Sequence, residues 1–247
     1  MRKVWLASII LVCFSMASFA EKKEVTIKSD DGFELKGSLY TPSRSGPGIL
    51  LLHQCNADRQ IYDTLATMLS TAGYSALTLD FRGFGGSKGA GADSASQSQR
   101  QQAQAKWPSD VDAALKFLGD QSKVNKTLLG VVGGSCGVNQ AIQAGRRHPE
   151  IRTLVLLSGG TNADGEAYIK NSSKIPILGA ASEEDSAAAE SIKKIVGLST
   201  NGDSKLTMLQ GAGHAATMFA KEPDLQADIV VWFRSNLPVA GYALTPR

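Results

Sequence analysis

The chain has 247 residues, of which 43% are hydrophobic and 20% charged, and its net charge is +3. This composition excludes a disordered or fibrous protein and is sufficient for one globular domain with a sizeable core. The near balance of 26 basic and 23 acidic residues argues against nucleic acid or an anionic membrane surface as a partner.

The first twenty residues have the pattern of a secretory signal peptide. Arg2 and Lys3 precede an apolar run from Val4 to Phe14, and Ser18-Phe19-Ala20 supplies small residues at the positions that a signal peptidase recognises. The apolar run is shorter than a membrane-spanning helix requires. We therefore expect cleavage after Ala20.

Cleavage at this position would leave residues 21–247 as a single mature domain with 24 basic and 23 acidic side chains, a net charge of +1. Cys13 does not fit a lipid attachment site, because Val12 precedes it where a small residue is expected. We expect a periplasmic or secreted protein without stable membrane insertion. Its two cysteines, Cys55 and Cys136, lie in a compartment that permits a disulfide.

Strand and helix patterns alternate along the mature chain. Segments 24–29 and 33–40 alternate in polarity on either side of Asp30-Asp31-Gly32 and predict a β-hairpin. Apolar runs typical of buried parallel strands follow at 48–53, 74–79, 127–132, 153–157, 175–181 and 206–209. Helices are expected at 59–72, from Pro108 onward, after Gly137, at 186–196 and at 224–235. The alternation predicts an α/β fold, a mostly parallel sheet with an N-terminal antiparallel hairpin and helices on both faces.

Residues 83–106 interrupt this pattern. They are rich in Gly, Ser, Ala and Gln, and we expect a long surface loop that passes into a polar segment. The gap between the strands at 153–157 and 175–181 has room for a short helix but not for a cap domain. Substrate specificity is therefore expected to come from loops, chiefly residues 55–60, 83–106 and 160–174.

The stretch Gly133-Gly134-Ser135-Cys136-Gly137 lies between a predicted strand and a helix-forming segment. In that context G-x-S-x-G forms a sharp turn that exposes its central side chain at the carboxyl end of the sheet. The first and last glycines must be small so that strand and helix can approach. Ser135 is therefore the candidate nucleophile. A turn centred on Cys136 is the alternative, but it would place bulky Val138 where space is needed.

A serine nucleophile needs a base to accept its proton, and the base needs an acid to orient it. Of the three histidines, His53 ends an upstream strand and His148 lies in a polar segment at a helix end. His214 follows the last predicted strand on a loop bracketed by glycine, so it is the candidate base. The alternative interpretation is a surface histidine.

Three consecutive acids, Glu183, Glu184 and Asp185, follow the strand at 175–181. Adjacent side chains point in different directions, so at most one of them can face His214. The alternative interpretation is a solvated acidic turn.

These segments resemble the α/β-hydrolase superfamily, most closely its small, capless dienelactone-hydrolase-like and esterase branch. Members often carry P-x-L-x-x-x-G-x-x-D at the acidic segment. Pro176, Leu178 and Asp185 match this spacing, whereas Ser182 replaces the glycine. The resemblance, which is clearest from Gly48 to His214, implies that Asp185 is the acid.

The segment from Asp80 to Ser87 also resembles the family, whose D-x-R-G-x-G-x-S motif has a mainly structural role beside the site. A phosphate-binding loop would instead need G-x-G-x-x-G opening a helix, which is absent here. The spacing of His53, Cys55, Cys136 and His214 fits no usual zinc pattern. We expect neither a cofactor nor a metal.

The resemblance further implies an oxyanion hole made by two backbone N–H groups. One belongs to Cys136, the residue after the nucleophile, and the other to the loop after His53. Family members usually read His-Gly-x with the third residue donating, which implies Cys55, but Gln54 replaces the glycine and remains a candidate. The same placement sets Cys55 and Cys136 on two walls of one cavity. A disulfide between them is expected, with two buried free thiols as the alternative.

The expected function is hydrolysis of a small carboxylic ester or lactone by a serine hydrolase that needs no cofactor. Ser135 would form the acyl-enzyme, with His214 as base and Asp185 as its orienting acid. A serine peptidase or acyltransferase on the same triad is an alternative. A catalytically silent binding protein of this fold is another, because Gln54 and Val138 depart from the family pattern.

Overall fold

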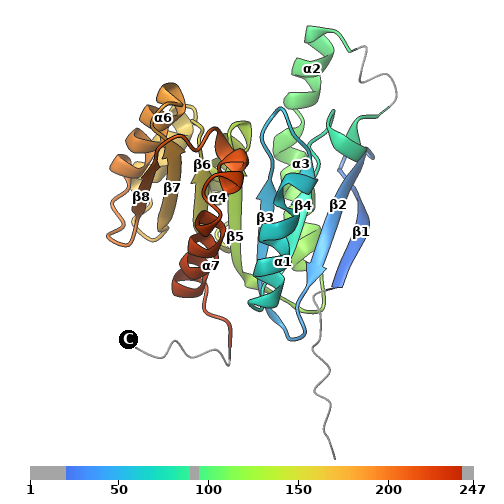
Figure 1. Ribbon diagram of the computed structural model, residues 1–247. Coiled ribbons are helices and arrows are strands. Elements are labelled where there is room, and N and C mark those ends of the chain that lie inside the picture. Colours follow the sequence, from blue (N-terminus) through green and yellow to red (C-terminus); the bar gives the residue numbers. More distant parts are fainter. Residues whose placement is uncertain (1–20, 90–94, 241–247) are drawn as a thin grey trace, which may run out of the picture.

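The computed structural model describes residues 21–89 and 95–240, so the predicted signal peptide lies outside the described residues. One eight-stranded sheet has the order β1-β2-β4-β3-β5-β6-β7-β8 (Figure 1). The strands are β1 Glu21–Lys28, β2 Glu34–Thr41, β3 Gly46–Leu52, β4 Ser75–Leu79, β5 Val124–Gly134, β6 Ile151–Leu157, β7 Ile177–Ser182 and β8 Lys205–Leu209. β2 runs antiparallel to β1 and β4, and the remaining neighbours are parallel. The predicted fold class is confirmed.

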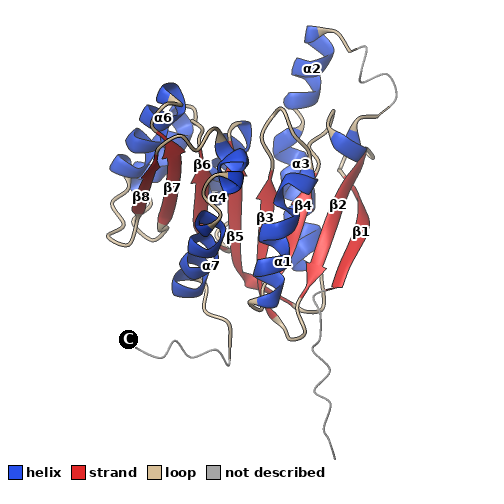
Figure 2. Cartoon of the chain, in the orientation of Figure 1, coloured by secondary structure: helices blue, strands red, loops and turns tan. Residues whose placement is uncertain are grey.

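Helices cover both faces of the sheet (Figure 2). On one face lie α1 Asp63–Thr71 and α7 Asp224–Asn236, and on the other α3 Trp107–Gly119, α4 Cys136–Arg147, α5 Ala163–Asn171 and α6 Ser186–Leu198. The alternation of side chains along a strand separates the two cores: Leu50 packs on the α3–α6 side, and the next residue, Leu51, packs on the α1–α7 side. Burial on both faces explains why these strands are continuous apolar runs.

Some element boundaries differ from the sequence prediction. The expected helix at 59–72 begins as a 3₁₀ turn, Arg59–Tyr62, whose N-cap is the Asp58 side chain accepting from the Gln60 N–H. β5 starts before 127 because Val124 and Asn125 pair with the first residues of β3 after a shift in register. Such pairing depends on a neighbouring strand, so the local pattern does not reveal it.

The described parts of the polar segment, residues 83–89 and 95–106, contain two short helical elements. A 3₁₀ turn, Gly85–Ser87, follows β4, and α2, Gln97–Gln104, starts at a capping box between Ser96 and Gln99. α2 buries none of its residues and extends away from the sheet beyond the strand ends (Figure 1). Across residues 21–89 and 95–240, no helix is sufficiently long and apolar to span a membrane.

Candidate active site

The turn at Ser135 is a strained connection between β5 and α4. Ser135 has φ 52° and ψ −115°, a conformation that costs a non-glycine residue about 1–3 kcal/mol. A Cβ on Gly133 would lie 2.4 Å from the Gly137 carbonyl oxygen, and one on Gly137 would lie 2.5 Å from that of Leu52. The expectation that both positions must be small is confirmed. The turn is centred on Ser135 rather than on Cys136.

Replacing Gly137 by alanine is expected to destabilise the protein by about 1–3 kcal/mol, because the new methyl group would overlap the β3 backbone. Gly197→Ala in α6 is the matched control, since nothing lies within 4 Å of a Cβ there. That change is expected to be neutral or stabilising by about 0.5–1 kcal/mol, the gain in helix propensity. Urea unfolding of both variants measures the difference, and equal stabilities would contradict the tight packing at the turn.

The structure brings the candidate base and acid together. His214 Nδ1 lies 2.6 Å from Asp185 Oδ2, and their side chains are 40% and 25% exposed. The carboxylate accepts from Nδ1–H, which leaves Nε2 as the proton acceptor. The His214 loop packs against the serine turn, since a Cβ on Gly134 would lie 3.4 Å from Cβ of Ala215.

The Ser135 hydroxyl, by contrast, is not hydrogen-bonded to His214 within the described residues. Catalytic hydrogen bonds are often long before substrate binds and tighten in the complex. The structure therefore shows the His–Asp half of the predicted triad as a formed contact and places Ser135 on the adjoining turn.

Each of the three consecutive acids has a different partner. Glu183 pairs with Lys193 at 3.0 Å, and Asp185 alone contacts His214. Glu184 accepts from the Ser182 hydroxyl at 2.7 Å and from the Gly213 N–H at 3.3 Å. The Ser182 hydrogen bond lowers the pKa of Glu184 to about 2, so this carboxylate remains ionised at neutral pH. The expectation that only one acid can face His214 is confirmed.

Ser182 and Gln54, which both replace a glycine of the family pattern, accept hydrogen bonds from the loop that carries His214. Before His214, Ser182 Oγ accepts from the Ala212 N–H at 2.9 Å. After it, the buried Gln54 side chain accepts from the Ala216 N–H at 3.0 Å. Sequence reasoning treated both residues only as missing glycines. The signal in the sequence was that each position has a side chain able to accept a hydrogen bond where the family has glycine, which has no side chain.

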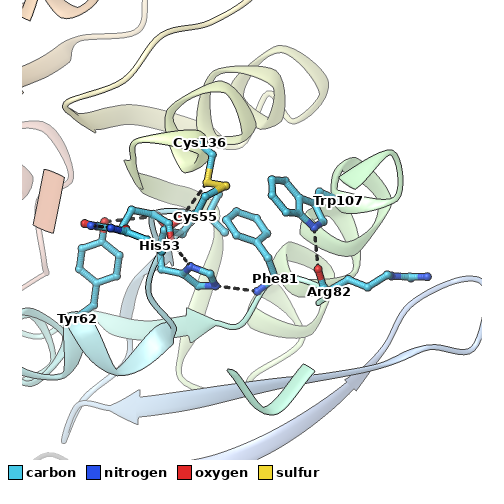
Figure 3. The surroundings of a disulfide bond; sticks show 10 residues. His53, Cys55, Tyr62, Phe81, Arg82, Trp107 and Cys136 are labelled. Carbon is cyan, nitrogen blue, oxygen red and sulfur yellow. Dashed lines mark hydrogen bonds between the residues drawn. A yellow bond between two sulfur atoms is a disulfide. The ribbon is translucent and has the colours of Figure 1, made fainter. Parts of the chain in front are cut away.

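His53 fixes the loop that follows β3. Its buried ring accepts from the Phe81 N–H at Nε2, 3.0 Å away, so Nδ1 carries the proton and donates to the Gln54 carbonyl at 2.7 Å (Figure 3). Burial lowers the pKa of His53, which keeps the ring neutral. The C=O and N–H of a trans peptide point in opposite directions. The Cys55 N–H is therefore directed away from the His53 ring.

A disulfide joins Cys55 to Cys136, with Cα atoms 5.8 Å apart (Figure 3). The predicted bridge is confirmed, and the free-thiol alternative is wrong. Cys136 as nucleophile is also wrong, because its sulfur is bonded to Cys55. The bridge closes a loop of 81 residues, worth about 4–5 kcal/mol in the chain-entropy model. A disulfide is compatible with the predicted export.

Two charged networks hold the segment from Asp80 to Ser87. Buried Asp80 pairs with the Arg59 guanidinium and accepts from the Gly86 N–H at 2.7 Å. Arg82 pairs with Asp31 and with buried Asp110, each at 2.7 Å. These contacts give the motif a structural role beside the candidate site.

An open cleft of about 660 Å³ lies next to the disulfide-bonded loop. Its walls are Asn56 to Gln60 on one side and Phe84, Gly85, Gly86 and Lys88 on the other. These walls belong to the loops 55–60 and 83–106, two of the three that we expect to determine specificity. Part of the third, 160–174, forms α5. Across the described ranges, no cluster of His, Cys, Asp and Glu side chains is suited to a metal ion.

The strand order, the strained serine turn after β5, and the His–Asp pair beyond β7 and β8 define an α/β hydrolase. A model of a hydrolase family described as serine aminopeptidase, S33, matches residues 47–174, more than half of the chain. The chain belongs to this family.

The chain also matches curated relatives and solved structures. Two uncharacterized Mycobacterium tuberculosis proteins, from strains H37Rv and CDC 1551, are each 29% identical over 142 residues, 57% of this chain. The chain matches only 46% of their length.

Among solved structures, the Pyrococcus furiosus esterase Pf2001 has a TM-score of 0.71 at 20% identity and covers 88% of this chain and 93% of its own. The dienelactone hydrolase of Anabaena variabilis has a TM-score of 0.66 at 17% identity and covers 88% of this chain and 99% of its own. At these identities the likeness concerns the fold.

Proposed function

We propose that this chain is a serine hydrolase that cleaves carboxylic esters or lactones with Ser135, His214 and Asp185. The observation that carries the proposal is the 2.6 Å contact between His214 and Asp185, on a loop packed against the strained Ser135 turn. Each residue follows a different strand of one sheet, and the carboxyl ends of parallel strands meet at one edge.

In the proposed reaction, Ser135 Oγ attacks the carbonyl carbon while His214 Nε2 takes its proton. The tetrahedral intermediate collapses when His214 donates that proton to the leaving alcohol, and the acyl group remains on Ser135. Water, deprotonated by His214, then releases the acid and restores the serine. Asp185 holds the tautomer that makes Nε2 basic and stabilises the imidazolium.

The oxyanion of the intermediate would be bound by the N–H groups of Cys136 and Cys55. Cys136 is the first residue of α4, where N–H groups have no partner within the helix. The orientation of the Gln54–Cys55 peptide supports Cys55 as the second donor, because His53 and Ala57 both donate to the Gln54 carbonyl and the Cys55 N–H points the opposite way. Removal of one such donor typically costs about 10²–10³ in kcat.

The alternative suggested by the family description is an aminopeptidase, which must bind the ammonium group of a free N-terminus. A carboxylate usually provides that contact. The acids nearest His214 are engaged elsewhere: Glu183 with Lys193, Glu184 with Ser182 and Gly213, and Asp185 with His214 itself. This favours an uncharged substrate, so we place ester or lactone hydrolysis first.

Initial rates on matched substrates test this choice. The protein is expected to hydrolyse p-nitrophenyl acetate or a short lactone faster than alanine p-nitroanilide, and to show no preference for alanine p-nitroanilide over its N-acetylated form. A strong preference for the free amino group would support the aminopeptidase instead. Absence of turnover on all of these substrates would favour a silent binding protein.

A further inference from the structure

The disulfide links two segments that come from neighbouring strands. Cys55 is the third residue after β3, and Cys136 is the first residue of α4, directly after Ser135. β3 and β5 pair in parallel up to Leu52 and Gly133, so their carboxyl ends lie side by side. The bridge, drawn in Figure 3, therefore joins the segments that follow the carboxyl ends of β3 and β5, and one of its two residues is next to Ser135 in the chain.

Both bridged residues carry a backbone N–H that makes no hydrogen bond in the part of the chain that the structure describes. A buried or half-buried N–H without a partner is uncommon in folded proteins. The Cα atoms of Cys55 and Cys136 are 5.8 Å apart, and an oxyanion hole requires two such donors close together.

The two segments are held by different contacts. The serine turn is fixed by the Ser135 N–H to the Leu157 carbonyl and by the Val138 N–H to the Ser135 carbonyl, both at 2.9 Å. The Cys55 segment is held through the Gln54 carbonyl, which accepts from His53 Nδ1–H and from the Ala57 N–H, but Cys55 itself makes no hydrogen bond within the described residues. The disulfide is thus the direct link between Cys55 and the turn.

We propose that the Cys55–Cys136 disulfide is a positioning device that sets the separation of the two oxyanion donors, so that the oxidised protein is the active form. The inference rests on the proposed function. An oxyanion exists only in the transition state and the tetrahedral intermediates, so displacement of Cys55 should lower kcat and leave KM nearly unchanged.

The test compares the oxidised protein, the protein reduced with dithiothreitol, and the double variant Cys55→Ala/Cys136→Ala. In the reduction, the S–S bond breaks and two S–H groups form, while dithiothreitol supplies two electrons and two protons and becomes its cyclic disulfide. We expect kcat for p-nitrophenyl acetate to fall about 10–100-fold in both bridge-free forms, with KM within about threefold. A boronic acid, which forms a tetrahedral adduct on serine, should lose affinity by a similar factor.

Leu118→Ala is the control for stability alone. Leu118 is buried in α3 beside Gly48, at the opposite end of β3, so its loss should lower the melting temperature without changing kcat while the protein is folded. If the double variant does not fold, reduction of the folded wild type and recovery of kcat on reoxidation still provide the test. Assays are run well below the melting temperature of each form.

Bridge-free protein with wild-type kcat and boronate affinity but a lower melting temperature would overturn the inference and show that the disulfide only stabilises the fold. The same would follow if Leu118→Ala lost as much kcat. Neither result bears on the nucleophile. Failure of the proposed function appears separately, as retention of activity by the Ser135→Ala protein.

Discussion

Replacement of Ser135 by alanine is expected to lower kcat for p-nitrophenyl acetate by about 10⁴–10⁶-fold in a protein that remains folded. The variant lacks the oxygen that forms the acyl-enzyme, so only binding and oxyanion stabilisation remain. Loss of the hydroxyl should not destabilise the fold, since the Ser135 side chain makes no hydrogen bond among the described residues.

Ser158→Ala is the matched control for this change. Ser158 also has a positive φ, 47°, and also follows a strand of the sheet, but its side chain is buried and its hydroxyl contacts Met218 Sδ. Its replacement should leave kcat within a few-fold of wild type. Wild-type turnover by the Ser135 variant, measured after purification free of other esterases, would refute the assignment of the nucleophile.

Replacement of Asp185 by asparagine is expected to lower kcat by about 10⁴-fold. The asparagine amide can donate to Nδ1 where the carboxylate accepts from it, which favours the tautomer with its proton on Nε2. That nitrogen then cannot take the proton of Ser135. The imidazolium formed during the reaction also loses the adjacent negative charge.

Glu183→Gln controls for the loss of a neighbouring charge. Glu183 is two residues from Asp185, is exposed, and pairs with Lys193. Exposed ion pairs contribute about 0–1 kcal/mol to stability, so this variant should retain wild-type kcat and fold normally. Equal losses in the two variants would indicate a general electrostatic effect rather than an orienting acid.

The sequence predicted those features that depend on local pattern and on the order of strands. Buried apolar runs identified the parallel strands, and the glycines around Ser135 identified the turn. The Cys55–Cys136 bridge followed from the family resemblance, because that alignment placed both residues at the oxyanion site.

The features that the sequence did not reveal depend on side-chain contacts between distant segments. Gln54 and Ala216 are 162 residues apart, and nothing in either local pattern indicates that they are hydrogen-bonded. The His53 ring donates to the Gln54 carbonyl and accepts from the Phe81 N–H. The contact with Phe81 likewise depends on the ends of β3 and β4 lying side by side. Long-range polar contacts therefore account for most of the difference between prediction and structure at this site.

The central claim is that Ser135 carries the acyl group, and trapping of the intermediate tests it most directly. The protein is mixed with p-nitrophenyl acetate, quenched in acid during turnover, reduced and digested with trypsin. The tryptic peptide 127–146 contains a single serine, Ser135, and fragmentation of this peptide distinguishes an acetyl group on Ser135 from one on Thr127 or Cys136. We predict an added acetyl group on Ser135, increased in the Asp185→Asn protein if deacylation becomes slower than acylation. Turnover of the ester with the acetyl group on another residue, and none on Ser135, would contradict the account.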